Sequence, residues 1–353
     1  MDSKRLGILL ILPALLVFVL LVLCPIIANF ILSLLSWDII TPPKFVGLSN
    51  YINMIRDVFL WKYAGNTLFF LFVQGGFTFL LVMFIVCLTS KTSQKFQAGM
   101  RLVFLIPAAA AFPVVYALIW RWLYNPDFGL INTLLAKIGI DGPDWLSSKT
   151  WAKPAMAIYH ICSYSGFWIC LGLIVFTGWY NAKTSNKGER YFLSPLFRFA
   201  IPTLASFIFL FPVMGSAYVM TGGGPAGATT TFGYYIYNNA FQWFKFGYAS
   251  ALSMIQLLVP VLLGLLVWYM ISKYKIQCVL KPDSKNNTAH HGRGKKIFLV
   301  LLTIIILLPW LISILWAFST SLKPPGEVFT FPPVWISKNL TWNNYARAWT
   351  SAP

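Results

Sequence analysis

Charged residues are scarce in this sequence of 353 residues: they make up 10% of it, and only 9 residues are Asp or Glu. Soluble domains carry about 25% charged residues. With 58% hydrophobic residues and a mean hydropathy of +0.71, the composition disfavours a water-soluble enzyme, a DNA-binding domain and a disordered protein. The apolar residues come in long blocks, which favours a protein that crosses a membrane many times. The formal charge of +18 then concerns the two sides of the membrane rather than nucleic acid.

Metal-ligating residues are also few, with 5 Cys and 3 His. No Cys has the spacing of a metal site and no pair indicates a disulfide, so we expect inert, mostly buried thiols. The adjacent His290 and His291 lie in a polar, basic stretch that is typical of a solvated linker. The glycine-rich segment Thr221–Gly227 lacks the Gly-Lys-Ser/Thr ending of a phosphate-binding loop. We therefore expect no metal, no cofactor and no catalytic residue.

What the sequence has is apolar blocks long enough to cross a membrane. A helix needs about 20 residues to do so, because each adds about 1.5 Å. The blocks are 8–35, 64–88, 102–123, 154–179, 199–220, 249–272 and 297–318. Backbone groups cannot stay unpaired in lipid, so these blocks predict an all-α, polytopic bundle of about seven spans. The charge-free stretch Leu6–Leu35 exceeds the roughly 7–15 apolar residues of a signal peptide, and we interpret it as an uncleaved first span.

The distribution of basic residues predicts the orientation. With the N-terminus in the cytoplasm, the inside segments hold most of the 27 Lys and Arg and fewer of the 9 Asp and Glu than the outside segments do. Basic residues favour the cytoplasmic side of a membrane protein. We therefore expect a multi-pass protein with a cytoplasmic N-terminus.

Charge is missing from the middle of every block. Ion-coupled transporters and most intramembrane catalytic sites use an ionisable residue there, so a pathway for a neutral polar solute is favoured. The fourth block contains Ser163, Tyr164 and Ser165, and the fifth contains Ser206. Hydroxyls beside aromatic rings suit sugar recognition, and we hypothesise that these four residues line the path. Any one of them is also explained as a hydrogen-bonding contact between helices.

The glycine-rich segment follows the fifth block on the predicted outer side. It consists of Thr221, Gly222, Gly223, Gly224 and Pro225. Three glycines and a proline predict a tight turn that ends the helix. The aromatic run 233–244 behind it is expected to lie at the outer membrane interface.

Several segments, in one order, are specific enough to indicate a family. They are Phe45–Tyr51, Gly65–Leu68, Asp127–Asn132, Pro143–Leu146, Tyr218–Pro225 and Phe246–Ala251. Over residues 8–275 the chain resembles the inner-membrane permease subunits of bacterial ATP-binding-cassette (ABC) sugar importers. The resemblance implies a second permease subunit, two cytoplasmic ATP-binding subunits, an external sugar-binding protein and a place in the bacterial inner membrane. It also implies that ATP hydrolysis occurs in the partner subunits rather than in this chain.

The sequence departs from the family between the fourth and fifth blocks. Family members carry a cytoplasmic helix there, with Glu-Ala-Ala, three residues and then Gly, which docks into the ATPase. The corresponding residues here are Lys187, Gly188, Glu189 and Arg190, without that pattern. One alternative is therefore a degenerate or scaffold-like permease that is not coupled to an ATPase. A secondary transporter is a further alternative, disfavoured by the uncharged span interiors.

A second departure concerns domain organisation. Residues 1–275 correspond to a first permease-like domain and residues 276–296 to a basic cytoplasmic linker. Ser319–Glu327 and Asn343–Tyr345 resemble the first span and first outer loop of the partner permease. We therefore expect residues 297–353 to be the start of a second permease-like domain, in a truncated fusion or a fragment of a longer one.

Overall fold

The computed structural model describes residues 3–89, 92–109, 113–183, 215–274, 293–327 and 334–351. Lys187, Gly188, Glu189, Arg190 and Ser206, which carry predictions, lie outside these residues. The described residues form a bundle of long α-helices with one short antiparallel hairpin, β1 (Leu35–Ser36) and β2 (Lys44–Phe45). The predicted all-α fold is therefore confirmed.

The long helices cross the molecule, and the short ones connect them. The long helices are α1 (Ser3–Phe18), α2 (Cys24–Ser33), α4 (Val58–Thr89), α5 (Gln94–Ala109), α6 (Pro113–Leu123), α8 (Ala152–Lys183), α11 (Phe246–Tyr274) and α12 (Arg293–Ser321). The π-helix η1 (Val19–Leu23) joins α1 to α2. The shorter elements are α3 (Ser49–Arg56), α7 (Leu130–Lys137), η2 (Ala217–Thr221), α10 (Phe232–Tyr237), η3 (Asn238–Gln242), η4 (Pro325–Glu327) and α13 (Asn343–Ser351).

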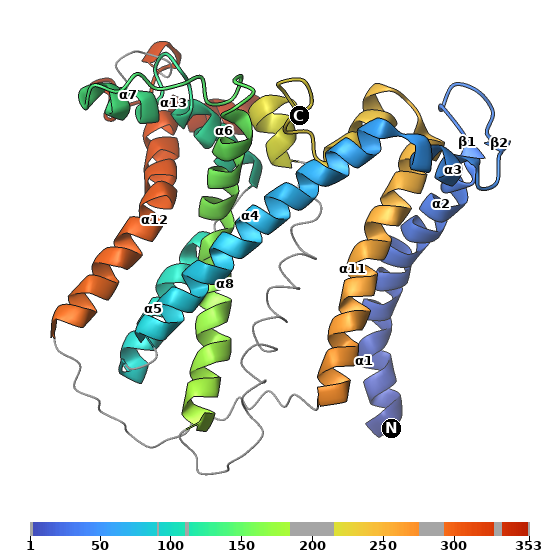
Figure 1. Cartoon of the computed structure of the whole chain (residues 1–353), viewed down its shortest axis with the longest axis horizontal. Helices are drawn as coiled ribbons and strands as arrows, with labels where there is room; N and C mark the ends of the chain where they lie inside the picture. The colour runs from blue at the N-terminus through green and yellow to red at the C-terminus, as the bar shows by residue number, and fades with distance from the viewer. Residues whose placement is uncertain are drawn as a thin grey trace.

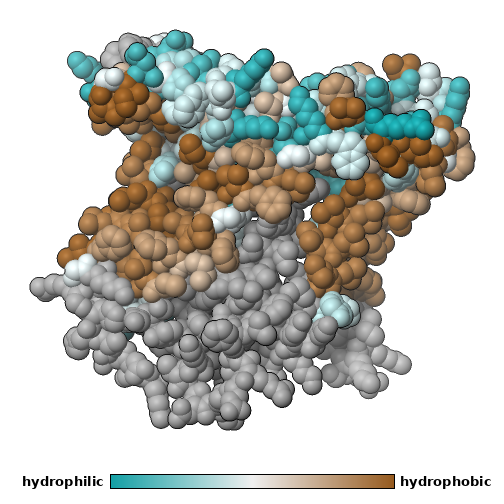
Figure 2. Space-filling view, in the orientation of Figure 1, coloured by the Kyte–Doolittle hydropathy of each residue, from teal (hydrophilic) through white to brown (hydrophobic). Residues whose placement is uncertain are grey.

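The segments predicted to lie outside the membrane gather at one end of the bundle. Figure 1 shows the hairpin, α3, α7 and α13 together at this end, which we call the loop end, and the N-terminus at the opposite end. Figure 2 shows hydrophilic side chains at the loop end and a hydrophobic band over the long helices below it. Leu21 of η1, Leu262 of α11 and Ile305 of α12 are exposed. Such a surface is expected where helices face lipid rather than water.

Three apolar helices are long enough to cross a membrane by themselves: Ile11–Ser33, Val58–Thr89 and Phe246–Leu266. Two more qualify as bent pairs, Ala152–Ser163 with Ser165–Leu173 and Ile297–Pro309 with Leu311–Ser321. The three single helices correspond to the first, second and sixth predicted spans. The two bent pairs correspond to the fourth and the seventh. The fifth predicted span, 199–220, lies mostly outside the described residues.

The third predicted span, 102–123, corresponds to two helices. It combines the end of α5 with α6, and Val114–Leu123 alone is shorter than a membrane span. The second helix begins at Pro113, which favours the first turn of a helix because it has no N–H group to donate.

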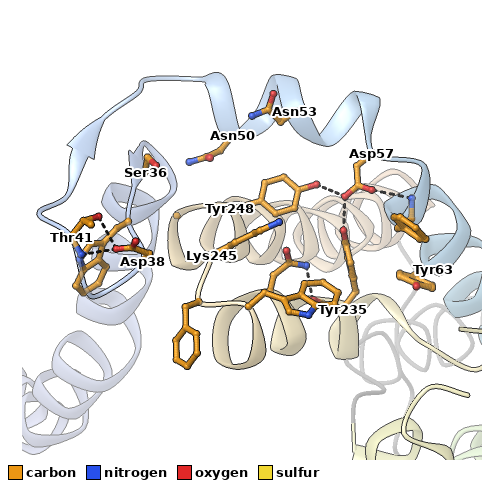
Figure 3. Close-up of a pocket in the computed structure, with 16 residues that line it drawn as sticks. Ser36, Asp38, Thr41, Asn50, Asn53, Asp57, Tyr63, Tyr235, Lys245 and Tyr248 are labelled. Carbon is orange, nitrogen blue, oxygen red and sulfur yellow. Dashed lines mark hydrogen bonds between the residues drawn. The ribbon is translucent and has the colours of Figure 1, made fainter.

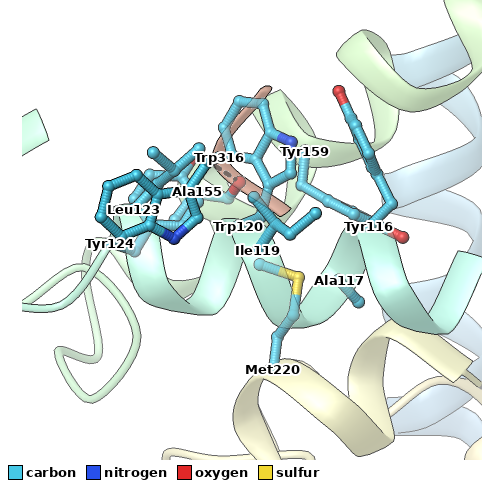
Figure 4. Packing of buried hydrophobic residues seen from close by; sticks show 10 residues of the cluster. All are labelled: Tyr116, Ala117, Ile119, Trp120, Leu123, Tyr124, Ala155, Tyr159, Met220 and Trp316. Carbon is cyan, nitrogen blue, oxygen red and sulfur yellow. Dashed lines mark hydrogen bonds between the residues drawn. The ribbon is translucent and has the colours of Figure 1, made fainter. Parts of the chain in front are cut away.

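The bundle has two parts that pack around different helices. α4 runs obliquely across the molecule (Figure 1) and packs, like α5, against α8, whereas α2 packs against α11. A cluster of buried aromatic and aliphatic side chains joins α6 to α8, η2 and α12 (Figure 4). Its buried rings include Tyr116, Trp120 and Tyr159, and Trp316 brings α12 into the same cluster.

Candidate functional site

Three of the four predicted sugar-contacting residues, Ser163, Tyr164 and Ser165, lie at a bend in α8. The axis turns by 41° between Ala152–Ser163 and Ser165–Leu173. The Ser163 hydroxyl donates a hydrogen bond of 2.7 Å to the carbonyl of Tyr159, one turn earlier. A serine that bonds back to its own helix in this way tends to bend it. The bend is therefore a consequence of the local sequence, although α8 contains no proline at this point.

Two of the four predicted path residues have described side chains at this bend. Ser163 is half-buried and Ser165 is buried. The side chain of Tyr164 and the whole of Ser206 lie outside the described residues. The proposed contact between the fourth and fifth spans therefore stays a prediction.

His160 lies one turn before the bend and connects α8 to the segment before the glycine-rich loop. Its Nε2 is 3.2 Å from the hydroxyl of Ser216, and its ring packs against Phe70 and Tyr159. Among the described residues no group of three His, Cys, Asp or Glu could hold a metal ion. His160 is thus a buried contact between segments, as expected for a polar residue inside a span.

The glycine-rich segment forms the predicted helix-ending turn. η2 ends at Gly222, which is left-handed with φ +58°, and Gly223 follows with φ +81°. A Cβ added to Gly223 would lie 2.4 Å from the Thr230 hydroxyl oxygen, so only glycine fits there. Thr230 in turn donates to the Gly223 carbonyl over 3.0 Å.

Hydroxyl groups from both sides of the turn close it. Thr221 shares a hydrogen bond of 2.6 Å with Thr229, and Thr229 donates to the carbonyl of Gly224 over 2.6 Å. Thr229 and Thr230 are buried. We call residues 221–231 the glycine loop. Its backbone is held by its own side chains, which makes it a formed structural element rather than an open connection.

The first turns of α4 hold the glycine loop from the other side. The Lys62 ammonium group donates to the Ala226 carbonyl over 2.8 Å. The Asn66 amide donates to the carbonyls of Gly227 and Thr230, at 3.0 and 2.9 Å. The sequence drew attention to Asn66 as part of the family pattern but assigned it no role, because nothing local shows that a loop 160 residues later returns to it.

A cavity of about 1050 Å³ opens beside this assembly at the loop end (Figure 3). It lies between the hairpin, α3, η3 and the start of α11. Asp57 accepts hydrogen bonds of 2.6 Å from the hydroxyls of both Tyr235 and Tyr248. The other oxygen of Asp57 accepts from the backbone amides of Phe59 and Leu60, at 2.9 and 3.2 Å, and so caps the start of α4.

The hydrogen bonds to Asp57 affect its ionisation. Burial raises the pKa of Asp57, but the bonds from Tyr235, Tyr248 and the two backbone amides outweigh burial and hold the pKa below its ordinary value. Burial, followed by the hydrogen bond to Asp57, raises the pKa of Tyr235. Asp57 is therefore a carboxylate that fastens α3, α4, α10 and α11 at one point.

The aromatic run 233–244 is only partly at the surface. Phe241, Trp243 and Phe244 are exposed, but Tyr234 and Tyr235 are buried in the packing between α4, α10 and α11. The first half of the run therefore packs inside the protein, and the position of the run at the membrane interface stays a prediction. The sequence pattern of the run does not show that Asp57 and α4, far away in the sequence, pack against Tyr234 and Tyr235.

Two solved structures show the class of protein to which this arrangement belongs. A bacterial alginate ABC transporter, crystallised with an alginate-bound periplasmic protein, matches 79% of this chain and 98% of its own, with a TM-score of 0.56 at 17% identity. A second structure, of an ABC transporter that imports alginate, matches 77% of this chain at the same TM-score. At such low identity these matches show the fold: a helical membrane bundle of the ABC importer type.

Relatives in sequence show the family. A probable ABC transporter permease protein of Pyrococcus horikoshii is 30% identical over 281 residues, which cover 74% of this chain and 94% of that protein. A probable ABC transporter permease of Bacillus subtilis is 29% identical, covering 75% of this chain and 95% of its own length. The trehalose/maltose transport system permease protein of Thermococcus litoralis is 28% identical, over 72% and 89%. No family model matches. The chain belongs to the permease proteins of ABC transporters, which confirms the resemblance.

Proposed function

We propose that this permease forms the solute path of an ATP-driven importer that takes a carbohydrate from an external binding protein. The observation that carries the proposal is the similarity to permeases of sugar systems, among them the trehalose/maltose protein and a sulfoquinovosyl glycerol permease of Agrobacterium fabrum at 29% identity. The uncharged, serine-containing bend of α8 supports a neutral polar solute.

The proposal includes the partners that such a system needs. They are a second permease subunit, two cytoplasmic ATP-binding subunits and an extracytoplasmic sugar-binding protein. ATP hydrolysis then belongs to the partner subunits and not to this chain. The loop end, with the glycine loop and the Asp57 cavity, faces the binding protein, and the N-terminus is cytoplasmic, in agreement with the distribution of Lys and Arg.

Within the path, Ser163 and Ser165 are the proposed sugar contacts on α8, together with Tyr164 and with Ser206 of the fifth predicted span. Uptake of labelled oligosaccharide by cells that carry the complete system tests this assignment. Ser163→Ala with Ser165→Ala is expected to lower uptake at least tenfold, while Ser147→Ala, at an exposed loop position, leaves it unchanged. Ser163→Thr keeps a hydroxyl that can bond back to Tyr159 and adds a methyl group at the proposed sugar contact, so it is expected to preserve the bend and lower uptake.

The energy source separates the proposal from its alternatives. Uptake by the importer stops when ATP is depleted and persists when the proton gradient is collapsed. The reverse pattern would identify a secondary transporter. Normal uptake in cells that lack this chain would identify a scaffold.

A further inference from the structure

One set of hydrogen bonds fastens the loop-end terminus of α2 to α3. The Ser33 hydroxyl donates to the Phe30 carbonyl over 2.6 Å and shares a bond of 2.7 Å with the hydroxyl of Tyr51. The Asn50 amide donates to the carbonyls of Ser33 and Leu35, both over 2.9 Å. We call Ser33, Asn50 and Tyr51 the first clamp.

The same set fastens the loop-end terminus of α12 to α13. The Ser321 hydroxyl donates to the Phe318 carbonyl over 2.7 Å and shares a bond of 2.7 Å with the hydroxyl of Tyr345. The Asn344 amide donates to the carbonyls of Ser321 and Lys323, over 2.9 and 2.7 Å. We call Ser321, Asn344 and Tyr345 the second clamp.

The backbone around the two clamps also corresponds. Leu34 and Leu322 each donate an amide to the carbonyl three residues earlier, at 3.1 and 3.2 Å. Each leucine then accepts from an amide that precedes the next helix, from Val46 over 3.0 Å and from Thr341 over 2.8 Å. Helix, clamp, loop and second helix occur in the same order both times. The segment from α12 to α13 is therefore a second copy of the segment from α2 to α3.

In the first copy, α11 covers the clamp. The amide of Gly247 lies 3.4 Å from the Trp37 carbonyl, and a Cβ added to Gly247 would lie 1.8 Å from the oxygen of Leu35. The same Leu35 carbonyl oxygen accepts a hydrogen bond from the Asn50 amide. Along the helix, the Asn29 amide donates to the Ser253 hydroxyl over 2.7 Å. A glycine in the first turn of α11 is thus what allows a membrane helix to lie against the clamp.

In the second copy the corresponding positions are more exposed. Asn50 is only 8% exposed and Met54 5%, whereas Asn344 is half-buried and Ala348, which corresponds to Met54, is exposed. Tyr345 is 47% exposed. Figure 1 shows α11 on the other side of the molecule from α12. No described helix takes the place beside α12 that α11 takes beside α2.

This exposed surface continues an interface that α12 already makes with the first permease unit. Trp316 stacks on Trp122 of α6 with 3.8 Å between ring centroids, and the Lys323 ammonium lies 3.8 Å above the ring of Trp316. Ile314, two residues before Trp316, lies about 200° around the helix from it and is exposed. α12 therefore packs against α6 on one side and is open on the other side.

We propose that the second clamp receives the first turn of a membrane helix from a second permease unit, and that this turn carries a glycine. The inference rests on the proposed permease function and names the part of the partner that binds here. The partner is a membrane helix that begins as α11 does, with a glycine against the carbonyl of Lys323, and not a soluble protein or lipid.

Photocrosslinking in the full chain tests the proposal in membranes of the cells that produce it. Benzoylphenylalanine at Ala348 is expected to form an adduct with a polypeptide segment outside residues 1–353, and mass spectrometry is expected to place that adduct at the start of a glycine-bearing membrane helix. Benzoylphenylalanine at Met54, the matched position, is expected to react within the chain, at α10 or α11. Asn344→Ala in the Ala348 variant is expected to lower the adduct yield severalfold.

Other outcomes overturn the proposal. They are an adduct with lipid only, an adduct within residues 1–353, and an adduct with a segment that is not a glycine-bearing helix start. Sugar uptake measured in the same cells separates this test from that of the function. Normal uptake without the expected adduct counts against the second clamp as a binding surface, and the adduct without uptake counts against the proposed function.

Discussion

At the loop end of α2, Asn50 is buried and Tyr51 half-buried beside α11, whereas at the loop end of α12 the corresponding Asn344 is half-buried and Tyr345 is exposed. The hydrogen bonds within the two clamps have nearly the same lengths. The comparison shows that the clamp is a local structure, which its own segment can form, and that burial is added by another helix. Among the described residues, α11 covers the first copy and no helix covers the second in the same way.

The largest effect is expected where α11 meets the first clamp. Gly247→Ala places a methyl group against the backbone oxygen of Leu35, which cannot move without displacing α2. Overpacking costs roughly 1–3 kcal/mol, and a backbone neighbour favours the upper end, about 3 kcal/mol. The measurement is denaturant unfolding in nanodiscs followed by tryptophan fluorescence. Gly264→Ala in the same helix, where no atom lies within 4 Å, is the control and is expected to be neutral or slightly stabilising.

A direct comparison of the clamps comes from Asn50→Ala and Asn344→Ala. Each removes two hydrogen bonds to backbone carbonyls. An unsatisfied buried carbonyl costs about 1–3 kcal/mol, whereas an exposed one is hydrated. We expect a loss of about 2 kcal/mol for Asn50→Ala and about 1 kcal/mol or less for Asn344→Ala, by the same unfolding measurement. Equal losses would contradict the difference in burial, and the exposed neighbours Asn53 and Asn343 supply the control variants.

Replacing the tyrosine of each clamp is expected to lower the free energy of unfolding by a similar amount in the two copies. Tyr51→Phe and Tyr345→Phe each remove one hydroxyl that bonds to a serine at 2.7 Å. A typical hydrogen bond contributes roughly 0.5–1.5 kcal/mol, and we expect about 1 kcal/mol or less in both variants. Ser33→Ala with Tyr51→Phe, and the matching pair in the second copy, complete two double-mutant cycles. A coupling energy present in one copy and absent from the other would show that the two segments are not equivalent.

The smallest effect depends on pH and is confined to the first copy. Asp57 follows α3, and the residue at the matching position of the second copy is Ser351, the last residue of α13. The folded-state pKa of Asp57 is below its unfolded value, so the carboxylate stabilises the fold at neutral pH and this contribution is lost as the pH falls below about 3.8, through the folded pKa. Between pH 5 and pH 3 the Asp57→Asn variant is therefore expected to lose less unfolding free energy than the wild type. The difference is about 1 kcal/mol or less, because solvent screens this partly exposed site. Asp127→Asn, in an exposed loop, is the control.

The sequence predicted those features that depend on local pattern. Apolar length gave five of the membrane helices, and Gly222 and Gly223 predicted the turn that both adopt with positive φ. The bend of α8 could not be predicted from proline, because it arises where the Ser163 hydroxyl bonds back to Tyr159. Pro260, in contrast, lies inside α11 without interrupting it. A proline alone does not show whether neighbouring helices compensate for the missing hydrogen bond.

The candidate site was predicted less completely than the fold. Ser163 and Ser165 are in the middle of α8 as expected, but the role of Asn66 and Asp57 depends on contacts with segments more than 150 residues away. Such pairings need the packed fold, since neither residue is unusual among its neighbours. The second copy was visible as a resemblance near Asn343–Tyr345, whereas its hydrogen bonds to Ser321 required the structure.

The most direct test of the account is ATP hydrolysis by the assembled system. The chain, its partner permease and the ATP-binding subunits are purified together in nanodiscs, and hydrolysis is measured with and without sugar-loaded binding protein. The permease function predicts that the ATP-binding subunits copurify with this chain and that the loaded binding protein raises hydrolysis severalfold. Failure of the ATP-binding subunits to copurify, or hydrolysis indifferent to the binding protein, would contradict it and leave a membrane scaffold in its place.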